Sequence, residues 1–168
     1  MKMTNAKRVA LCAVMATVAL LFSYIESFVP MPMPGMKLGL ANLVPLLLIP
    51  TVGLPAAATV SLLRILLSSL LFGSLVSFVY SIVGGIVSFL VMALFFKLRT
   101  FGLCGVSILG GVFHNVGQTV VAIFLFGTAR VVVLLPVLLL SGAVAGYLLG
   151  VLATLILKRM ERTALFRK

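Results

Sequence analysis

Four ionisable side chains lie in apolar surroundings of the sequence, where a charge is costly. Glu26 comes near the end of the first apolar segment, Lys37 follows in a proline-rich stretch, and Arg64 lies near the middle of a later segment. Arg130 precedes the last apolar segment. A charge at the centre of a membrane span costs about 2.5–3.5 kcal/mol on insertion scales. Three cations against one carboxylate leave a positive excess, which an anionic ligand or its phosphate would neutralise.

An alternative explains the same charges without a ligand. Long basic side chains can extend to lipid headgroups, so that Lys37 and Arg130 face the headgroups and only Arg64 pairs with Glu26. We favour this interpretation for Arg130. For Arg64 and Lys37 we favour the ligand site.

Uncharged polar residues accumulate midway along one apolar segment. His114, Asn115 and Gln118 are close in sequence, and the spacing of four between His114 and Gln118 places both on one face of a helix. Asn42 and Tyr80 add polar groups in other segments. His114 alone is also compatible with an interhelical hydrogen bond or a proton relay. The expected ligand site comprises Glu26, Lys37, Asn42, Arg64, Tyr80, His114, Asn115 and Gln118.

Residues for enzyme chemistry are scarce. The chain has no Walker A pattern for ATP hydrolysis. Its two carboxylates, Glu26 and Glu161, are expected on opposite sides of a membrane, so they cannot form the multi-carboxylate Mg²⁺ site that diphosphate chemistry requires. His114 lacks partners for a metal site. We therefore expect no enzyme activity, no metal and no cofactor.

The elements that carry these residues are predicted to be membrane helices. Hydrophobic residues make up 63% of the 168 positions and charged residues only 9%, against about 25% charged in soluble domains. We expect an all-α bundle of six transmembrane helices in a single membrane domain, 1–168, with a bend at Pro136. A span needs about 20 apolar residues, so the second is short or discontinuous, or re-entrant. The expected spans are 6–29, 38–49, 54–72, 76–96, 104–126 and 131–157.

The stretch Pro30–Pro45, reading PMPMPGMKLGLANLVP, interrupts this helical pattern. Proline fixes φ and removes a hydrogen-bond donor, so the stretch cannot be one continuous helix. Irregular backbone at membrane depth is tolerated where protein covers it or where it lines a wet cavity. We expect this stretch to form a wall of the ligand site.

The positive charge follows a topological pattern. Although the net charge of +11 is compatible with nucleic-acid binding, ten of the thirteen cations form three clusters beside predicted spans. Such clusters mark the cytoplasmic side, so we expect both termini in the cytoplasm, a lipid-bilayer environment and no nucleic-acid partner. The clustered cations are Lys2, Lys7, Arg8, Lys97, Arg99, Lys158, Arg159, Arg162, Arg167 and Lys168.

Small residues recur at helical spacing on two predicted helices. Gly142, Gly146 and Gly150 form a ridge for which we favour packing within the chain. Ala6, Ala10 and Ala13, followed by Thr17, form a stripe on the first helix, and we refer to these three alanines as the alanine stripe. For the alanine stripe, packing within the chain and docking of a partner subunit are both open.

Four separate motifs resemble one family of small bacterial membrane proteins. These motifs are PGMKLGLANLVPLLLI (34–49), RILLSSLLFGS (64–74), YSIVGGIVSF (80–89) and GGVFHNVGQ (110–118). In this order they resemble the Gx transporters, also labelled heptaprenyl diphosphate synthase component I. The resemblance covers about residues 7–157. That family is in turn similar to the substrate-binding S components of energy-coupling factor transporters.

The resemblance implies six helices in a bacterial cytoplasmic membrane, with a ligand pocket that opens outward. It also implies that an alanine motif on the first helix docks a transmembrane partner driven by two ATPases. Ala6 and Ala10 fit the alanine-x-x-x-alanine form of this motif, whereas Ala13 is followed four residues later by Thr17. The family is further associated with flavin-based extracellular electron transfer.

Two functions follow from these observations. The first is a substrate-binding subunit of an importer for an anionic or amphipathic small molecule, such as a vitamin, a flavin or an isoprenoid-like compound. The second is a non-catalytic membrane accessory component of polyprenyl or quinone biosynthesis, or of flavin-based electron transfer. A synthase would need aspartate-rich metal motifs, and the sequence contains no aspartate.

Overall fold

Six α-helices make up most of the computed structural model, which describes residues 4–31 and 36–162. Two short 3₁₀ helices, η1 (Leu40–Asn42) and η2 (Ala129–Leu134), precede α2 and α6. The α-helices are α1 (Asn5–Ser27), α2 (Leu43–Thr51), α3 (Leu54–Phe72), α4 (Leu75–Leu98), α5 (Leu103–Phe126) and α6 (Leu135–Arg162). Five of these segments are long and apolar enough to cross a membrane, and η1 with α2 forms a shorter apolar one. The protein is therefore a multi-pass membrane protein, and the predicted six-helix fold with a short second helix is confirmed.

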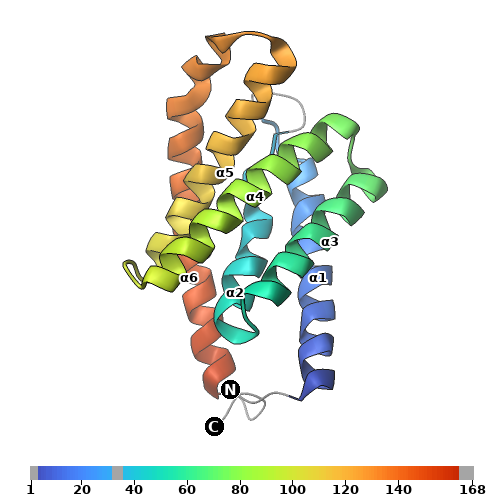
Figure 1. Cartoon of the computed structure of the whole chain (residues 1–168), viewed down its shortest axis with the longest axis vertical. Helices are drawn as coiled ribbons and strands as arrows, with labels where there is room; N and C mark the ends of the chain where they lie inside the picture. Colours follow the sequence, from blue (N-terminus) through green and yellow to red (C-terminus); the bar gives the residue numbers. More distant parts are fainter. Residues whose placement is uncertain (1–3, 32–35, 163–168) are drawn as a thin grey trace.

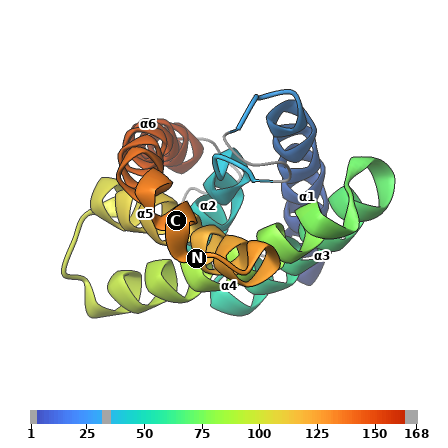
Figure 2. The ribbon, with the colours of Figure 1, turned by 90° about the horizontal axis from the view of Figure 1, so that it is seen from above.

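The short helix α2 lies in the middle of the bundle. It contacts each of the other five α-helices, and the view from above shows it between α6 and α1 (Figure 2). Every residue from Leu43 to Ile49 is buried. A helix that is apolar on all sides is stable only when protein or lipid surrounds it. Here the five longer helices take the place of lipid.

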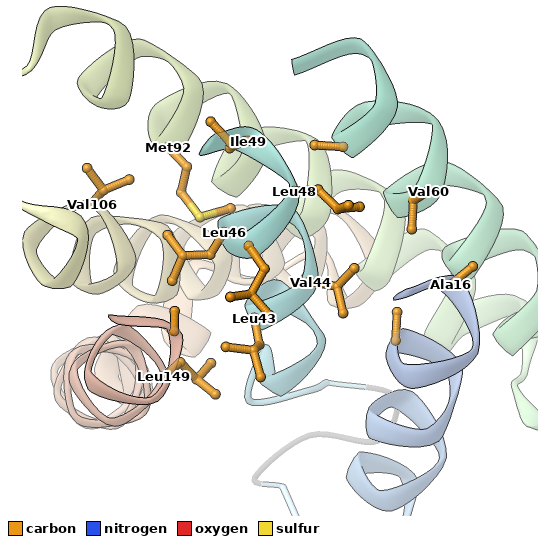
Figure 3. Packing of buried hydrophobic residues seen from close by; sticks show 14 residues of the cluster. Ala16, Leu43, Val44, Leu46, Leu48, Ile49, Val60, Met92, Val106 and Leu149 are labelled. Carbon is orange, nitrogen blue, oxygen red and sulfur yellow. The ribbon is translucent and has the colours of Figure 1, made fainter. Parts of the chain in front are cut away.

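The side chains of α2 organise the main hydrophobic core. They extend in all directions from the helix and meet apolar residues of the surrounding helices (Figure 3). The labelled members of this cluster are Leu43, Val44, Leu46, Leu48 and Ile49 on α2, with Ala16, Val60, Met92, Val106 and Leu149 around them. Side chains of α2 therefore form a packing surface that the surrounding helices share.

The segment from η1 to α2 runs along the length of the bundle. Its first residue, Leu40, bonds to Glu26 near the end of α1, while the guanidinium of Arg8 donates to the carbonyl oxygen of Val52 at 3.0 Å. Arg8 and Glu26 lie about 27 Å apart along α1, at 1.5 Å per residue. A re-entrant course would return both ends of the segment to one side, so this geometry favours a crossing.

The chain begins and ends its described helices at the same end of the bundle, since the start of α1 and the end of α6 lie together at the bottom of Figure 1. The last expected span differs in detail from the structure. Its first residues form η2, and Pro136 lies in the first turn of α6 rather than at a bend in the helix. Proline is tolerated there because the first backbone N–H groups of a helix have no intrahelical partner.

The glycine ridge of α6 packs inside the chain, as predicted, against α5. A Cβ on Gly146 would lie 2.6 Å from the carbonyl oxygen of Ser107, and one on Gly150 would lie 2.7 Å from Cα of Cys104. Gly111 of α5 faces Gly142 in the same way, backbone against backbone. Only glycine permits this close approach of the two helices.

We predict that Gly111→Ala destabilises the bundle by about 3 kcal/mol or more, because its methyl group would overlap the Gly142 backbone, which cannot move without separating α5 from α6. Thermal unfolding in mild detergent measures the change. Gly102→Ala is the control, since no atom lies within 4 Å of a Cβ at that position, and we expect less than about 1 kcal/mol. Equal melting temperatures for the two variants would contradict the packing described for α5 and α6.

Candidate functional site

The connection between α1 and α2 returns into the bundle through a hydrogen bond to Glu26. The backbone N–H of Leu40, at the start of η1, donates to Glu26 Oε1 at 2.5 Å. Gly39 precedes it with φ +88°, where an L side chain is strained, and a Cβ there would lie 3.0 Å from Asn42 and 3.2 Å from the His114 ring. Glycine at position 39 thus allows both the turn and its tight fit against α5.

Glu26, Lys37 and Arg64 form a buried charge cluster. Their exposed fractions are 2%, 5% and 3%. The positive charge of Arg64 acts most strongly on Glu26, and that of Lys37 acts more weakly. Arg64 also donates to Ser23 Oγ at 3.3 Å, so α3 is bound to α1 at this depth. Two cations and one carboxylate leave one positive charge in excess.

Lys37 is the member of this cluster whose charge is least well compensated. Burial, and then the neighbouring charge of Arg64, lower the pKa of Lys37, while Glu26 opposes the change. An anion placed near Lys37 would stabilise the charged ammonium and neutralise the excess. The geometry therefore favours an anion.

Arg130 does not belong to the cluster. Its side chain is exposed in η2, in line with the headgroup interpretation that we favour for this residue. Of the three cations that the sequence singles out, the structure brings Lys37 and Arg64 to Glu26, which leaves one positive charge in excess.

His114 and Gln118 of α5 fix the backbone at Lys37 through hydrogen bonds. Gln118 Nε2 lies 2.9 Å from His114 Nε2, and Gln118 Oε1 accepts the backbone N–H of Lys37 at 3.2 Å. Both side chains are almost fully buried. This pair therefore holds the backbone of the connecting segment against α5 and leaves the Lys37 ammonium free for other contacts.

Asn42 and Asn115 connect helices to one another. Asn42 donates to Ser88 Oγ at 3.1 Å, and Ser88 donates to the carbonyl oxygen of Gly110 at 2.8 Å, which joins η1, α4 and α5. Asn115 donates to the carbonyl oxygen of Leu138 on α6. The structure thus places these two amides in hydrogen bonds between helices, where the sequence predicts contact with a ligand.

Several buried polar atoms have no protein partner in the part of the chain that the structure describes. Buried groups of this kind are the ones that a bound molecule or an internal water would satisfy. Tyr80, which is fully buried, contributes its hydroxyl to this set. The atoms are Glu26 Oε2, Tyr80 Oη, Ser81 Oγ, His114 Nδ1 and Asn115 Oδ1.

A cavity of about 440 Å³ adjoins the charge cluster. Of the eight residues expected in the ligand site, Glu26 and Lys37 line this cavity, and the other six lie outside its wall. Its volume is within the range of about 300–1,000 Å³ that small-molecule sites occupy. The lining consists of Glu26, Ser27, Val29, Met31, Met36, Lys37, Phe72, Gly73, Ser74 and Ser77.

The α3–α4 turn contributes lining residues that are not among the site residues expected from the sequence. Phe72, Gly73 and Ser74 end α3 and begin α4, and Ser74 Oγ accepts the backbone N–H of Ser77 as the N-cap of α4. The available signal is the Gly-Ser pair between two apolar segments, which marks a turn.

The alanine stripe lies on the outside of the bundle. Ala6, Ala10 and Ala13 are exposed, whereas Ala16 and Ala19 of the same helix are buried. Packing of the stripe against the chain's own helices, one of the two alternatives, is therefore not what the structure shows. The stripe is open to lipid or to another protein.

Comparison with known proteins identifies both a family and a fold. The family described as heptaprenyl diphosphate synthase component I matches residues 15–156. A solved structure of the S component of a bacterial ECF transporter is similar to the chain with a TM-score of 0.72 at 18% sequence identity. The similarity covers 94% of this chain and 96% of that chain, so the two share a fold. The chain has no match among curated protein sequences.

We predict that Glu26 and Arg64 are energetically coupled. Arg64→Met removes the strongest positive charge that acts on the buried Glu26 carboxylate, together with the hydrogen bond to Ser23, so we expect it to destabilise the protein. Adding Glu26→Gln removes the unpaired charge and retains an acceptor for Leu40, so the double variant should be more stable than Arg64→Met alone. Chemical unfolding of the single and double variants in detergent measures this coupling.

The matched control for this double-mutant comparison combines Glu26→Gln with Arg130→Met. Arg130 is exposed, so the effects of these two substitutions should add within about 0.5 kcal/mol. Additive effects of Glu26→Gln and Arg64→Met would contradict the buried charge cluster.

Proposed function

The chain belongs to the heptaprenyl diphosphate synthase component I family, and from this premise we propose that it is the substrate-binding membrane subunit of an energy-coupling-factor-like importer. The observation that carries the proposal is the cavity of about 440 Å³ with Lys37 in its wall and one positive charge in excess at its base. Such a cavity suits an anionic or amphipathic small molecule.

The transport step requires a partner in this proposal. The sequence carries no Walker A pattern, so a transmembrane partner and two ATPases supply the energy. The partner docks on the alanine stripe, because small exposed residues allow another helix backbone to approach closely. Both termini face the cytoplasm, in accordance with the basic clusters, and the cavity opens on the opposite side.

A second candidate function comes from the description of the family, which names a synthase component. Since the sequence has no aspartate, the chain would present a polyprenyl or quinone-pathway lipid to a soluble synthase, or support flavin-based electron transfer, without catalysis of its own. Copurification separates the two candidates. A transmembrane subunit with ATPases supports the importer, and an aspartate-rich soluble synthase supports the accessory role. Uptake that survives loss of the ATPases would count against the importer.

We predict that Lys37→Gln lowers the occupancy of a copurified anionic molecule by at least about tenfold, since one charge-assisted hydrogen bond contributes about 1.5–3 kcal/mol. The backbone N–H of Lys37 keeps its bond to Gln118 in this variant, so the wall itself remains in place. Quantitative mass spectrometry of the extracted ligand measures the occupancy.

Arg130→Gln is the matched control, because it removes one positive charge from an exposed position outside the cavity wall. The occupancy of the copurified anion in this variant should equal that in the wild type. If both variants retain the anion equally, the cavity is not its binding site.

A further inference from the structure

Two hollows follow the outer surface of the α3–α4 pair. The first, about 300 Å³, lies at the turn between the helices, and the second, about 100 Å³, lies deeper along them. The first is lined by Leu66, Ser69, Leu70, Gly73, Ser74, Leu75 and Phe78. The second is lined by Ala58, Ser61, Leu62, Ile65, Gly85, Ile86, Phe89 and Leu90.

The register of the helices places both hollows on one face. On α3, Leu62 of the deeper hollow is four residues from Leu66 of the outer one. On α4, Phe78 is seven residues from Gly85, which is again one helical face. The two hollows therefore follow one another along one face of the helix pair, and we call them together the α3–α4 groove.

The outer part of the α3–α4 groove adjoins the charged cavity. Gly73 and Ser74 line both of them. A Cβ at Gly73 would lie 2.7 Å from Cα of Ser69, so a larger residue has no room there, and Ser74 has a short side chain that caps α4. The rim between cavity and groove thus carries no bulky side chain.

The chemistry of the surface changes at this rim. The cavity contains Glu26 and Lys37, whereas the groove is lined mainly by aliphatic and aromatic side chains. Two of the three serine hydroxyls of the groove donate to carbonyl oxygens of their own helix, Ser61 to Ala57 at 2.7 Å and Ser69 to Ile65 at 2.8 Å, and Ser74 Oγ accepts the backbone N–H of Ser77 at 3.1 Å. They therefore present little free hydrogen-bonding capacity to an occupant.

From this arrangement we propose that the ligand is a single-chain anionic amphiphile whose head binds beside Lys37 and whose apolar chain crosses the Gly73–Ser74 rim into the α3–α4 groove. The proposal rests on the function proposed above and adds the class of substrate and its route. Lipid tails are as apolar as this groove, so moving the ligand's apolar chain from the bilayer into the groove costs little free energy. The head enters the cavity sideways from the outer leaflet while the chain remains in an apolar environment.

Photolabelling of the protein in lipid nanodiscs tests the proposal. The probe is dodecyl phosphate with a diazirine at the end of its chain, and peptide mass spectrometry locates the label. We expect label on residues 58–90, lowered at least about fivefold by an excess of butyl phosphate, which competes for the head site but has too short a chain to occupy the groove. Lys37→Gln should lower the labelling to a similar extent.

Groove variants test the position of the chain separately from that of the head. Ser69→Phe fills the outer part of the groove, and Ser61→Leu fills the deeper part if Ser69→Phe does not fold. Each should lower labelling of residues 58–90 at least about fivefold while binding of butyl phosphate stays unchanged. Val144→Phe is the matched control, because Val144 is an exposed apolar residue on α6, away from the groove.

The outcomes separate this inference from the proposed function. If the wild type does not bind butyl phosphate in a Lys37-dependent way, the anion site itself is overturned. If butyl phosphate binds but the diazirine labels the apolar faces of α1, α5 and α6 as strongly as the groove, only the route of the chain is overturned. In that case the groove holds bulk lipid.

Discussion

One buried carboxylate connects the core of this protein to its candidate site. Glu26 accepts the first backbone N–H of η1, where a helix end carries partial positive charge, and it lies in the field of two buried cations. The same bond positions η1 and hence α2, whose side chains organise the hydrophobic core. Glu26 therefore contributes to the fold of the bundle as well as to the wall of the cavity, and its replacement affects both.

Several of the polar groups inside the bundle hold helices together. Asn42, Asn115 and Gln118 each have a partner on another segment, so these costly side chains stabilise the arrangement of η1, α4, α5 and α6 around the site. The groups that face the cavity are fewer, with Lys37 as its cation. Electrostatic attraction to an anion thus comes from a small part of the polar interior, and the surrounding methionine and phenylalanine side chains determine the shape.

The fold was largely predictable from the sequence, because long apolar runs specify membrane helices and a short, proline-bounded run specifies a discontinuous one. The burial of Lys37 and Arg64 near Glu26 was also predictable, since an isolated charge in a span requires compensation. The central position of α2 was not, because an apolar helix of this length is compatible with burial in protein or in lipid.

The sequence also could not predict which polar residues face the cavity and which bind a neighbouring helix. An asparagine that binds a ligand and one that binds a neighbouring helix have the same spacing and the same surroundings in sequence. The cavity residues Met31, Met36 and Phe72 resemble every other apolar position of the chain. Only the fold, in which Met31 and Met36 lie beside the C-terminal end of α1 and the α3–α4 turn, brings them together.

The central claim is that the cavity between α1, the connecting segment and the α3–α4 turn binds an anion through Lys37. The most direct measurement is an experimental structure of the protein purified with its native small molecule in place. The account predicts an acidic group of that molecule within ion-pair distance of the Lys37 ammonium, enclosed by Met36 and Phe72. A molecule bound elsewhere on the bundle, or one that places a neutral or cationic group beside Lys37, would contradict it.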